Sequence, residues 1–362
     1  MRAKLGDVCQ KGTSNIAQKD LEGHSGNYPI FGASGFISNV DFYQQEKPYI
    51  AVVKDGAGIG RVMKLPAKSS VIGTMQYIIP NDTVDISFLA YAMKYMNLSK
   101  YFTGATIPHI YFKDYQKEEL NLPSLDVQRK IAVVLDKVSD LIAKRRQQLD
   151  KLDEMVKARF VEMFGDPVFN PYQWEKVSLS DLADVRIGPF GSLLHKEDYI
   201  VGGHPLVNPS HILSDKIIVD EKLSVSSQKY AELEPYHLNI GDVVMGRRGE
   251  MGRCAVVEYE GLLCGTGSLI IRPKNNVTAD YIQKIISFPS FKKTIEDMAV
   301  GQTMPNLNVP IVSSFQIIKP PLEIQERYYT FVNQTEKTKT TISRSLEKLE
   351  TLKKALMQEY FG

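Results

Sequence analysis

The sequence predicts an α+β protein in which two tandem globular domains are separated by two long helices that pair as an antiparallel coiled coil. Three observations lead to this fold class. The chain contains an internal pseudo-two-fold repeat, each repeat ends in a long apolar heptad pattern, and the other segments mix strand and helix patterns. A length of 362 residues is enough for two or three independent cores.

The repeat becomes visible when the chain is shifted along itself. At an offset of 197 residues, 14 positions are identical over 62, including Pro123 with Pro320 and Phe164 with Phe361. At an offset of 192, Gly60-Arg61 coincides with Gly252-Arg253. The repeat therefore predicts four segments, namely a first domain at 1–123, a helix at 124–165, a second domain at 166–321 and a second helix at 322–362.

Each predicted long helix carries apolar residues at alternating steps of four and three, the pattern of a coiled-coil seam. Thr335 and Thr338 weaken the middle of the second seam. Antiparallel pairing would place the two globular segments at opposite ends of a rod, and the alternative is an ordinary helical hairpin packed on a globular body. The seam residues are Ile131, Leu135, Val138, Ile142, Leu149, Leu152 and Val156 in the first helix, and Leu346, Leu349, Leu352 and Leu356 in the second.

The globular segments each show three strand patterns followed by one helix pattern. The strands are expected at 49–53, 60–63 and 76–79, and again at 242–245, 253–257 and 268–271. The helices are expected at 85–102 and 278–286, with Thr83 or Asp85 and then Thr278 as N-caps. Both domains are therefore expected to be α+β.

Composition narrows the possible functions. The chain is 43% hydrophobic and 24% charged, and it has neither a membrane-length apolar run nor a readable secretory signal, so we expect a cytoplasmic protein without a membrane partner. Three cysteines and six histidines match no metal-ligand spacing, so no metal site is expected. Residues 166–321 hold 15 basic and 18 acidic groups, so any nucleic-acid surface there must be a local cluster.

Several ordered motifs resemble the specificity subunits of type I restriction-modification systems, and the resemblance covers essentially the whole chain. The first half contains YPIFGASG (28–35), YIAVVKDGAGIGRV (49–62), TGATIPHIYFKD (103–114) and LPSLDVQRKI (122–131). The second half contains IGPFGS (187–192), IGDVVMGRRGEMGR (240–253) and PPLEIQ (320–325). The first half departs from the usual arginine of the second motif by having Lys54, which cannot reproduce an arginine fork.

The resemblance implies two target-recognition domains that each read one half-site of a bipartite sequence in double-stranded DNA. It also implies partners, because the helices of that family dock methyltransferase subunits that use S-adenosylmethionine to methylate adenine. Nuclease-translocase subunits then complete the restriction enzyme. The chain itself is expected to be a non-catalytic subunit without a cofactor of its own.

The motifs also suit groove reading on physical grounds, because glycine-rich hairpins can approach DNA closely and bring cations and amides with them. Arginine fits guanine and asparagine or glutamine fits adenine. The candidate DNA-binding residues are Lys54, Arg61, Thr106, His109, Tyr111 and Lys113 in the first domain, and Arg247, Arg248, Arg253, Gln302, Asn306 and Asn308 in the second.

Two other functions remain as alternatives. A single-chain DNA adenine methyltransferase would need an NPPY-like loop and a GxGxxG turn, whereas this sequence has Asn170-Pro171-Tyr172 and the shorter spacing of Gly56 to Gly60. A stand-alone DNA-binding or scaffold protein without enzyme partners would have the same sequence features, and co-purification with a methyltransferase would distinguish it.

Overall fold

The computed structural model describes residues 1–104, 108–299 and 306–362, which fold into two compact units. Unit 1 comprises Met1–Leu149 and Thr341–Gly362, and unit 2 comprises Asp150–Thr340. The predicted segments divide the chain at the ends of the long helices, whereas the compact units divide both helices. Within the described residues, no helix is long and apolar enough to cross a membrane.

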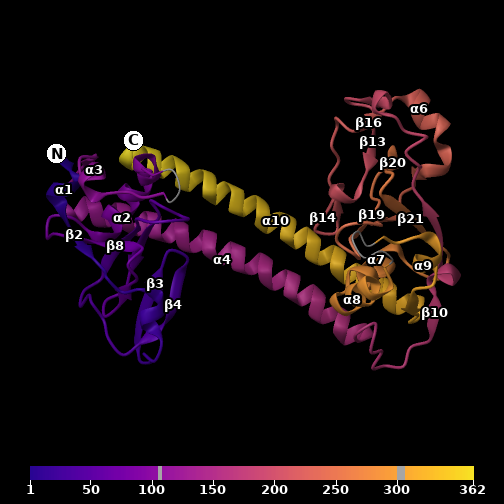
Figure 1. Cartoon of the computed structure of the whole chain (residues 1–362), viewed down its shortest axis with the longest axis horizontal. Helices are drawn as coiled ribbons and strands as arrows, with labels where there is room; N and C mark the ends of the chain where they lie inside the picture. The colour runs from indigo at the N-terminus through magenta and orange to yellow at the C-terminus, as the bar shows by residue number, and fades with distance from the viewer. Residues whose placement is uncertain (105–107, 300–305) are drawn as a thin grey trace. The chain divides into compact units, whose positions relative to one another are not determined.

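Unit 1 contains two sheets and a small ladder (Figure 1). The first sheet is antiparallel and has the order β2 (Cys9–Thr13), β8 (Met75–Pro80), β5 (Tyr49–Val53), β6 (Val62–Leu65). The second has the order β4 (Gly35–Val40), β3 (Tyr28–Gly32), β7 (Ser70–Val71), with β3 and β7 parallel. β1 (Arg2–Lys4) pairs with β9 (Glu119–Asn121), and the short helices are α1 (Leu5–Val8), α2 (Ile86–Tyr95) and α3 (Phe112–Tyr115).

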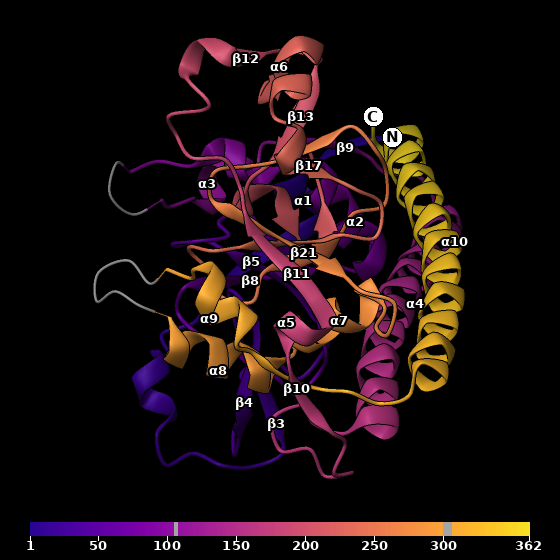
Figure 2. The same cartoon turned by 90° about the vertical axis from the view of Figure 1, so that its right-hand side faces the viewer.

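Unit 2 repeats this arrangement. Its first sheet has the order β11 (Ala183–Ile187), β21 (Ser268–Pro273), β18 (Val243–Gly246), β19 (Cys254–Val256). Its second has the order β12 (Tyr199–Ile200), β16 (Ser224–Val225), β13 (His204–Val207), β20 (Leu262–Cys264), β17 (His237–Leu238), with β13 and β20 parallel. β10 (Lys176–Ser178) pairs with β22 (Gln316–Ile318), and β14 (Ile212–Leu213) with β15 (Lys216–Ile217). The helices, several of which are seen in Figure 2, are α5 (Leu179–Leu182), α6 (Ser227–Glu232), α7 (Ala279–Ser287), α8 (Pro289–Met298) and α9 (Val309–Ser313).

The predicted internal repeat is confirmed by this topology. In both units a four-stranded antiparallel sheet is followed along the chain by a helix, α2 or α7, and a second sheet contains one parallel strand pair. The central strands β5 and β18 are buried on both faces. Alternate residues of β5 belong to two different cores, with Ile50 and Val52 facing α2 and the intervening residues facing the second sheet. A strand buried on both faces reads as a continuous apolar run, which is why the sequence located it well.

The two long helices are α4 (Leu125–Phe164) and α10 (Leu322–Phe361), each of 40 residues, and their ends are related by the offset of 197. Within each unit they lie side by side in both views (Figures 1 and 2). Arg146 pairs with Glu350 at 2.7 Å in unit 1, and Lys339 with Asp153 at 2.7 Å in unit 2. α4 ends at Gly165, whose φ of +76° favours glycine.

Most of the predicted seam is covered. In α4, Leu135, Val138 and Ile142 are buried, and the other predicted members are half-buried. In α10 the prediction of a covered seam fails at Leu352. Leu352 is 46% exposed, while the adjacent Lys353 is half-buried and places its ammonium 5.8 Å from the ring of Tyr91. Thr338 is exposed, and the Lys339 ammonium, neutralised by Asp153 and Glu336, takes its place.

The helix predicted at 85–102 ends early. Asp85 is the N-cap of α2 and accepts hydrogen bonds from Ser87 N and Phe88 N, but Asn97 adopts a left-handed conformation with φ of 51°. The chain then continues as a 3-10 helix at Leu98–Tyr101. In unit 2, Thr278 caps α7, and Pro289 begins a separate helix, α8. The apolar spacing continues past Asn97, so periodicity alone made the first helix too long, whereas the helix predicted at 278–286 agrees with α7 to within one residue.

One buried glutamine at the start of each long helix fixes that helix to its domain. Gln128 accepts a hydrogen bond from Asp85 N at 2.8 Å and donates to Pro123 O at 2.9 Å. Gln325, at the equivalent position, accepts from Thr278 N at 3.2 Å and donates to Pro320 O at 2.9 Å. Each glutamine therefore links the cap of the domain helix to the proline before the long helix.

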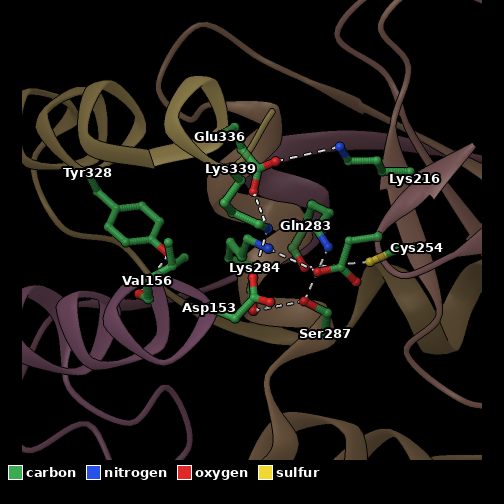
Figure 3. A network of polar contacts seen from close by, with 11 residues as sticks. Asp153, Val156, Lys216, Cys254, Gln283, Lys284, Ser287, Tyr328, Glu336 and Lys339 are labelled. Carbon is green, nitrogen blue, oxygen red and sulfur yellow. Dashed lines mark hydrogen bonds and ion pairs between the residues drawn. The ribbon is translucent and has the colours of Figure 1, made fainter. Parts of the chain in front are cut away.

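In unit 2 an ionic network connects the domain with the helix pair (Figure 3). Lys216 of the β14–β15 hairpin lies 3.5 Å from Glu336 of α10, and Glu336 in turn contacts Lys339 at 2.7 Å. Asp215 pairs with Lys284 of α7 at 2.9 Å. The turn of this hairpin has two non-glycine residues in the left-handed region, Ser214 and Asp215, with φ of 49° and 63°. These contacts hold a turn that would otherwise be strained.

Candidate nucleic-acid interface

Each unit carries a glycine-rich hairpin directly after its central buried strand. In unit 1 the hairpin is 54–61, and Gly56, Gly58 and Gly60 have φ of +79°, +87° and +79°. In unit 2 it is 247–253, with Gly249 and Gly252 at +81° and +74°. Residues with a side chain rarely adopt such positive φ angles, so the glycines determine the shape of the hairpins.

A second loop lies against each hairpin. In unit 1, Gly56 N donates to Pro108 O and Ile110 N to Lys54 O, both at 3.0 Å. In unit 2, Leu307 N donates to Arg247 O at 2.9 Å. We call residues 54–61 with 108–111 the first paired-loop site, and residues 247–253 with 306–308 the second paired-loop site. Thr106 and Gln302, which were predicted as contacts, lie outside the described residues.

The two paired-loop sites correspond at several positions. Isolated β-bridges join Asp55 to His109 in the first and Arg248 to Asn306 in the second. The offset of 197 places His109 on Asn306 and Tyr111 on Asn308. Lys54 N donates to Thr74 O and Arg247 N to Gly267 O, so Lys54 and Arg247 also correspond. The same backbone scaffold thus presents different side chains in the two units.

In the first paired-loop site Asp55 lies between two basic side chains, those of Lys54 and His109. The Asp55 carboxylate contacts Nδ1 of His109 and lies 3.9 Å from the Lys54 ammonium, and all three side chains are 23–29% exposed. The ring centroid of His109 is 4.2 Å from that of Tyr111, and Lys113 lies over the Tyr111 ring at 5.1 Å. Burial, with a smaller contribution from Lys11, lowers the pKa of Lys54. The structure therefore brings four of the predicted residues together and adds Asp55, which the sequence did not single out.

In the second paired-loop site the guanidinium of Arg247 donates from Nε to Asn306 Oδ1 at 3.1 Å. Arg247 is half-buried, and Arg248 beside it is exposed. Burial and the charge of Arg248 lower the pKa of Arg247. Two arginines that are adjacent in the sequence therefore form a local group of positive charge, although residues 166–321 are net acidic. Binding of an anion in this domain would need such a local group.

Two predicted DNA contacts, Arg61 and Arg253, also make hydrogen bonds within the protein. Arg61 donates to Ala33 O at 2.8 Å, and Arg253 donates to Pro209 O at 3.1 Å. Ala33 follows β3 and Pro209 follows β13, so each arginine ties its hairpin to the second sheet at the same place. Arg253 also pairs with Glu250 at 2.7 Å. The sequence contained a signal for this structural role, because the same arginine occurs in both halves. A residue that reads a different base in each half would have no reason to recur.

Asn308 also has a structural role. Its side chain caps α9 by accepting a hydrogen bond from Ile311 N at 2.9 Å. Its counterpart Tyr111 precedes α3, makes no such cap and is 46% exposed. The cap occupies Oδ1 of Asn308 and leaves only its amide nitrogen for a base. Among the described residues, no group of three or more His, Cys, Asp or Glu side chains could hold a metal ion.

Comparison with known proteins agrees with this geometry. The family model described as "Type I restriction modification DNA specificity domain" matches residues 1–153 and 171–351. The type I restriction enzyme MjaVIII specificity subunit of Methanocaldococcus jannaschii is 22% identical over 98% of this chain and 90% of its own length. The fold resembles the crystal structure of a type I restriction-modification S subunit from M. genitalium, with a TM-score of 0.68 and 15% identity over 100% and 96% of the two chains. A structure from work on complex assembly in a type I system matches with a TM-score of 0.58 and 15% identity over 99% and 97%.

Proposed function

Because this chain belongs to the family of type I restriction-modification DNA specificity subunits, we propose that its two paired-loop sites read the two halves of a bipartite site in double-stranded DNA. Each site is assigned one half-site. The chain itself selects the sequence, and partner subunits carry out the chemistry on the DNA that it has selected.

One observation carries this assignment. The same two-loop scaffold occurs in both units, yet equivalent positions hold Lys54 and Arg247, Asp55 and Arg248, and His109 and Asn306. Residues that maintain the scaffold, such as Arg61 and Arg253, are instead the same in both. Constant support with variable polar side chains is what two readers of different sequences require, because base edges differ only in donors, acceptors and methyl groups.

The partners proposed are methyltransferase subunits, which would bring S-adenosylmethionine, and nuclease-translocase subunits. Support comes from a second apolar row on α4, outside the seam. Val127, Val134 and Leu141 follow one another at steps of seven and are 42%, 38% and 44% exposed. Such a row on one face of a helix is suited to packing against another protein. It favours an assembled complex over a stand-alone DNA-binding scaffold.

The test is reconstitution with a type I methyltransferase subunit that co-purifies with this chain. The complex should methylate duplexes containing one bipartite sequence, and the isolated chain should show only background incorporation from labelled S-adenosylmethionine. Turnover by the isolated chain would overturn the assignment of chemistry to the partner. Exchanging residues 166–321 for those of a relative should change one half-site only, and a change in both half-sites would refute independent reading.

A further inference from the structure

His109 is held in one tautomer by its neighbour. The Asp55 carboxylate contacts Nδ1 of the ring, and an ionised carboxylate can only accept a hydrogen bond. Nδ1 must therefore carry the proton. In a neutral imidazole the other nitrogen, Nε2, is then an acceptor.

The surroundings of His109 favour the neutral form of its ring. Burial is the larger cause that lowers the pKa of His109 below its usual 6.5, and the Lys54 ammonium lowers it further. Asp55 opposes this shift, but its charge is shared with Lys54 at 3.9 Å. The Tyr111 ring packs against the His109 ring. Within the described part of the chain, no hydrogen bond occupies Nε2 of His109.

The equivalent residue in unit 2 is held with the opposite polarity. Arg247 donates from Nε to Asn306, and a guanidinium cannot accept, so the amide must turn its oxygen toward Arg247. The amide nitrogen Nδ2, which carries two hydrogens, then faces away from the arginine. Position 109 therefore offers an acceptor where position 306 offers donors.

We propose that His109 and Asn306 are specificity-determining residues that read opposite hydrogen-bond polarity in the two half-sites. His109 accepts through Nε2 from an exocyclic amino group, that of adenine or cytosine. Asn306 donates through Nδ2 to a base acceptor, such as O6 or N7 of guanine or O4 of thymine. Asp55 and Arg247 are positioning residues that set these polarities. This inference rests on the proposed function and adds the chemistry of each half-site to it.

The first experiment removes the amino group from the DNA. Once the half-sites are known from selection on random duplexes, purine replaces each adenine, or 2-pyrimidinone each cytosine, one position at a time in the first half-site. At one position, affinity of the complex should fall about 5- to 150-fold, the range expected for one base contact. In the His109→Ala variant, the same analogue should reduce the affinity no more than it does when it is placed in the unread spacer. The identity of that base distinguishes adenine from cytosine.

The second experiment inverts the tautomer. In Asp55→Asn the new amide can donate to Nδ1, which moves the ring proton to Nε2 and turns the acceptor into a donor. Preference at that base should change from an amino-bearing base to one with an acceptor. A purely structural role for Asp55 predicts uniform weakening on every sequence. For Asn306→Asp, which removes the donors, the preferred base of the second half-site should change in the opposite sense.

His24→Ala is the matched control. His24 is also paired with an aspartate, Asp41, at 2.7 Å in the same unit, but it lies outside both paired-loop sites. This variant should retain the wild-type base preference. If the complex binds no DNA sequence selectively, the proposed function fails. If it binds selectively but His109→Ala keeps the full analogue penalty, this inference alone is wrong. The His109→Ala variant tests this inference even if the Asp55→Asn variant does not fold.

Discussion

Replacing Gln325 with alanine should destabilise unit 2 strongly, because this side chain is 1% exposed and makes both of its hydrogen bonds to main-chain groups. The substitution leaves Thr278 N and Pro320 O without their partner. Each unsatisfied buried group costs about 1–3 kcal/mol, so we expect a loss of about 2–4 kcal/mol when the helix-cap N–H regains some contact with water.

The assay can report on unit 2 selectively. Trp174 is the only tryptophan of the sequence, lies in unit 2 and donates from Nε1 to Phe164 O at 3.1 Å. Its fluorescence during urea unfolding should show a midpoint lower by about 1–2 M, given a slope near 2 kcal/mol per molar urea. Gln334→Ala, at an exposed position of the same helix, should change the free energy of unfolding by less than about 0.5 kcal/mol. Equal midpoints for the two variants would refute the role assigned to the buried glutamine.

Four further predictions follow from contacts described above. Arg253→Ala should weaken discrimination at every base pair of the second half-site, because it releases from Pro209 the hairpin that carries Arg247 and Arg248, and a loss confined to a single base pair in a binding panel would contradict this. Ser214→Asn should stabilise unit 2 by about 0.5–1 kcal/mol in the Trp174 assay, since asparagine tolerates the left-handed region better, and a lower midpoint would argue against strain in that turn. Burial raises the pKa of the Cys9 thiol to about 12 and raises those of Cys254 and Cys264, so Ellman's reagent at pH 8 should label the thiols only as urea unfolds the protein, and rapid labelling of the native chain would disprove the burial argument. Base discrimination at the first half-site should be present at neutral pH and lost as the pH falls through the lowered pKa of His109, because protonation converts Nε2 into a donor. Binding titrations across the same pH range should show unchanged discrimination at the second half-site, which Asn306 reads.

The parts of the fold that the sequence predicted are those with long or continuous signals. The heptad pattern of α4 and the apolar run of β5 each repeat one simple rule over many residues. The second sheets were missed because β7 and β16 have only two residues each, and their pairing depends on strands distant in the sequence. The end of α2 depends on one left-handed residue, Asn97, inside an unbroken apolar pattern.

The candidate site shows a different limit. Arg253 and Asn308 were chosen because their side chains can bond bases, but the same groups equally well satisfy a carbonyl or cap a helix. Asp55 was passed over because a carboxylate is not expected near DNA. Its role depends on contact with His109 from the second loop, and no sequence pattern records that distance. Comparing the two halves recovers part of the answer, since scaffold residues recur and reading residues differ.

The division of the chain into units also sets the order in which they can be completed during protein synthesis. Unit 2 is a continuous stretch, residues 150–340, whereas unit 1 needs residues 341–362 in addition to the first 149. Phe361 packs 5.2 Å from Phe88, and Gln358 accepts a hydrogen bond from Tyr95 at 2.7 Å. Because a ribosome adds roughly 5–20 residues per second, the first domain waits for about 10–40 s with part of its α4 seam and α2 uncovered. The domain that is synthesised first is therefore finished last, and a message truncated before codon 341 would leave unit 1 incomplete although its first 149 residues are present.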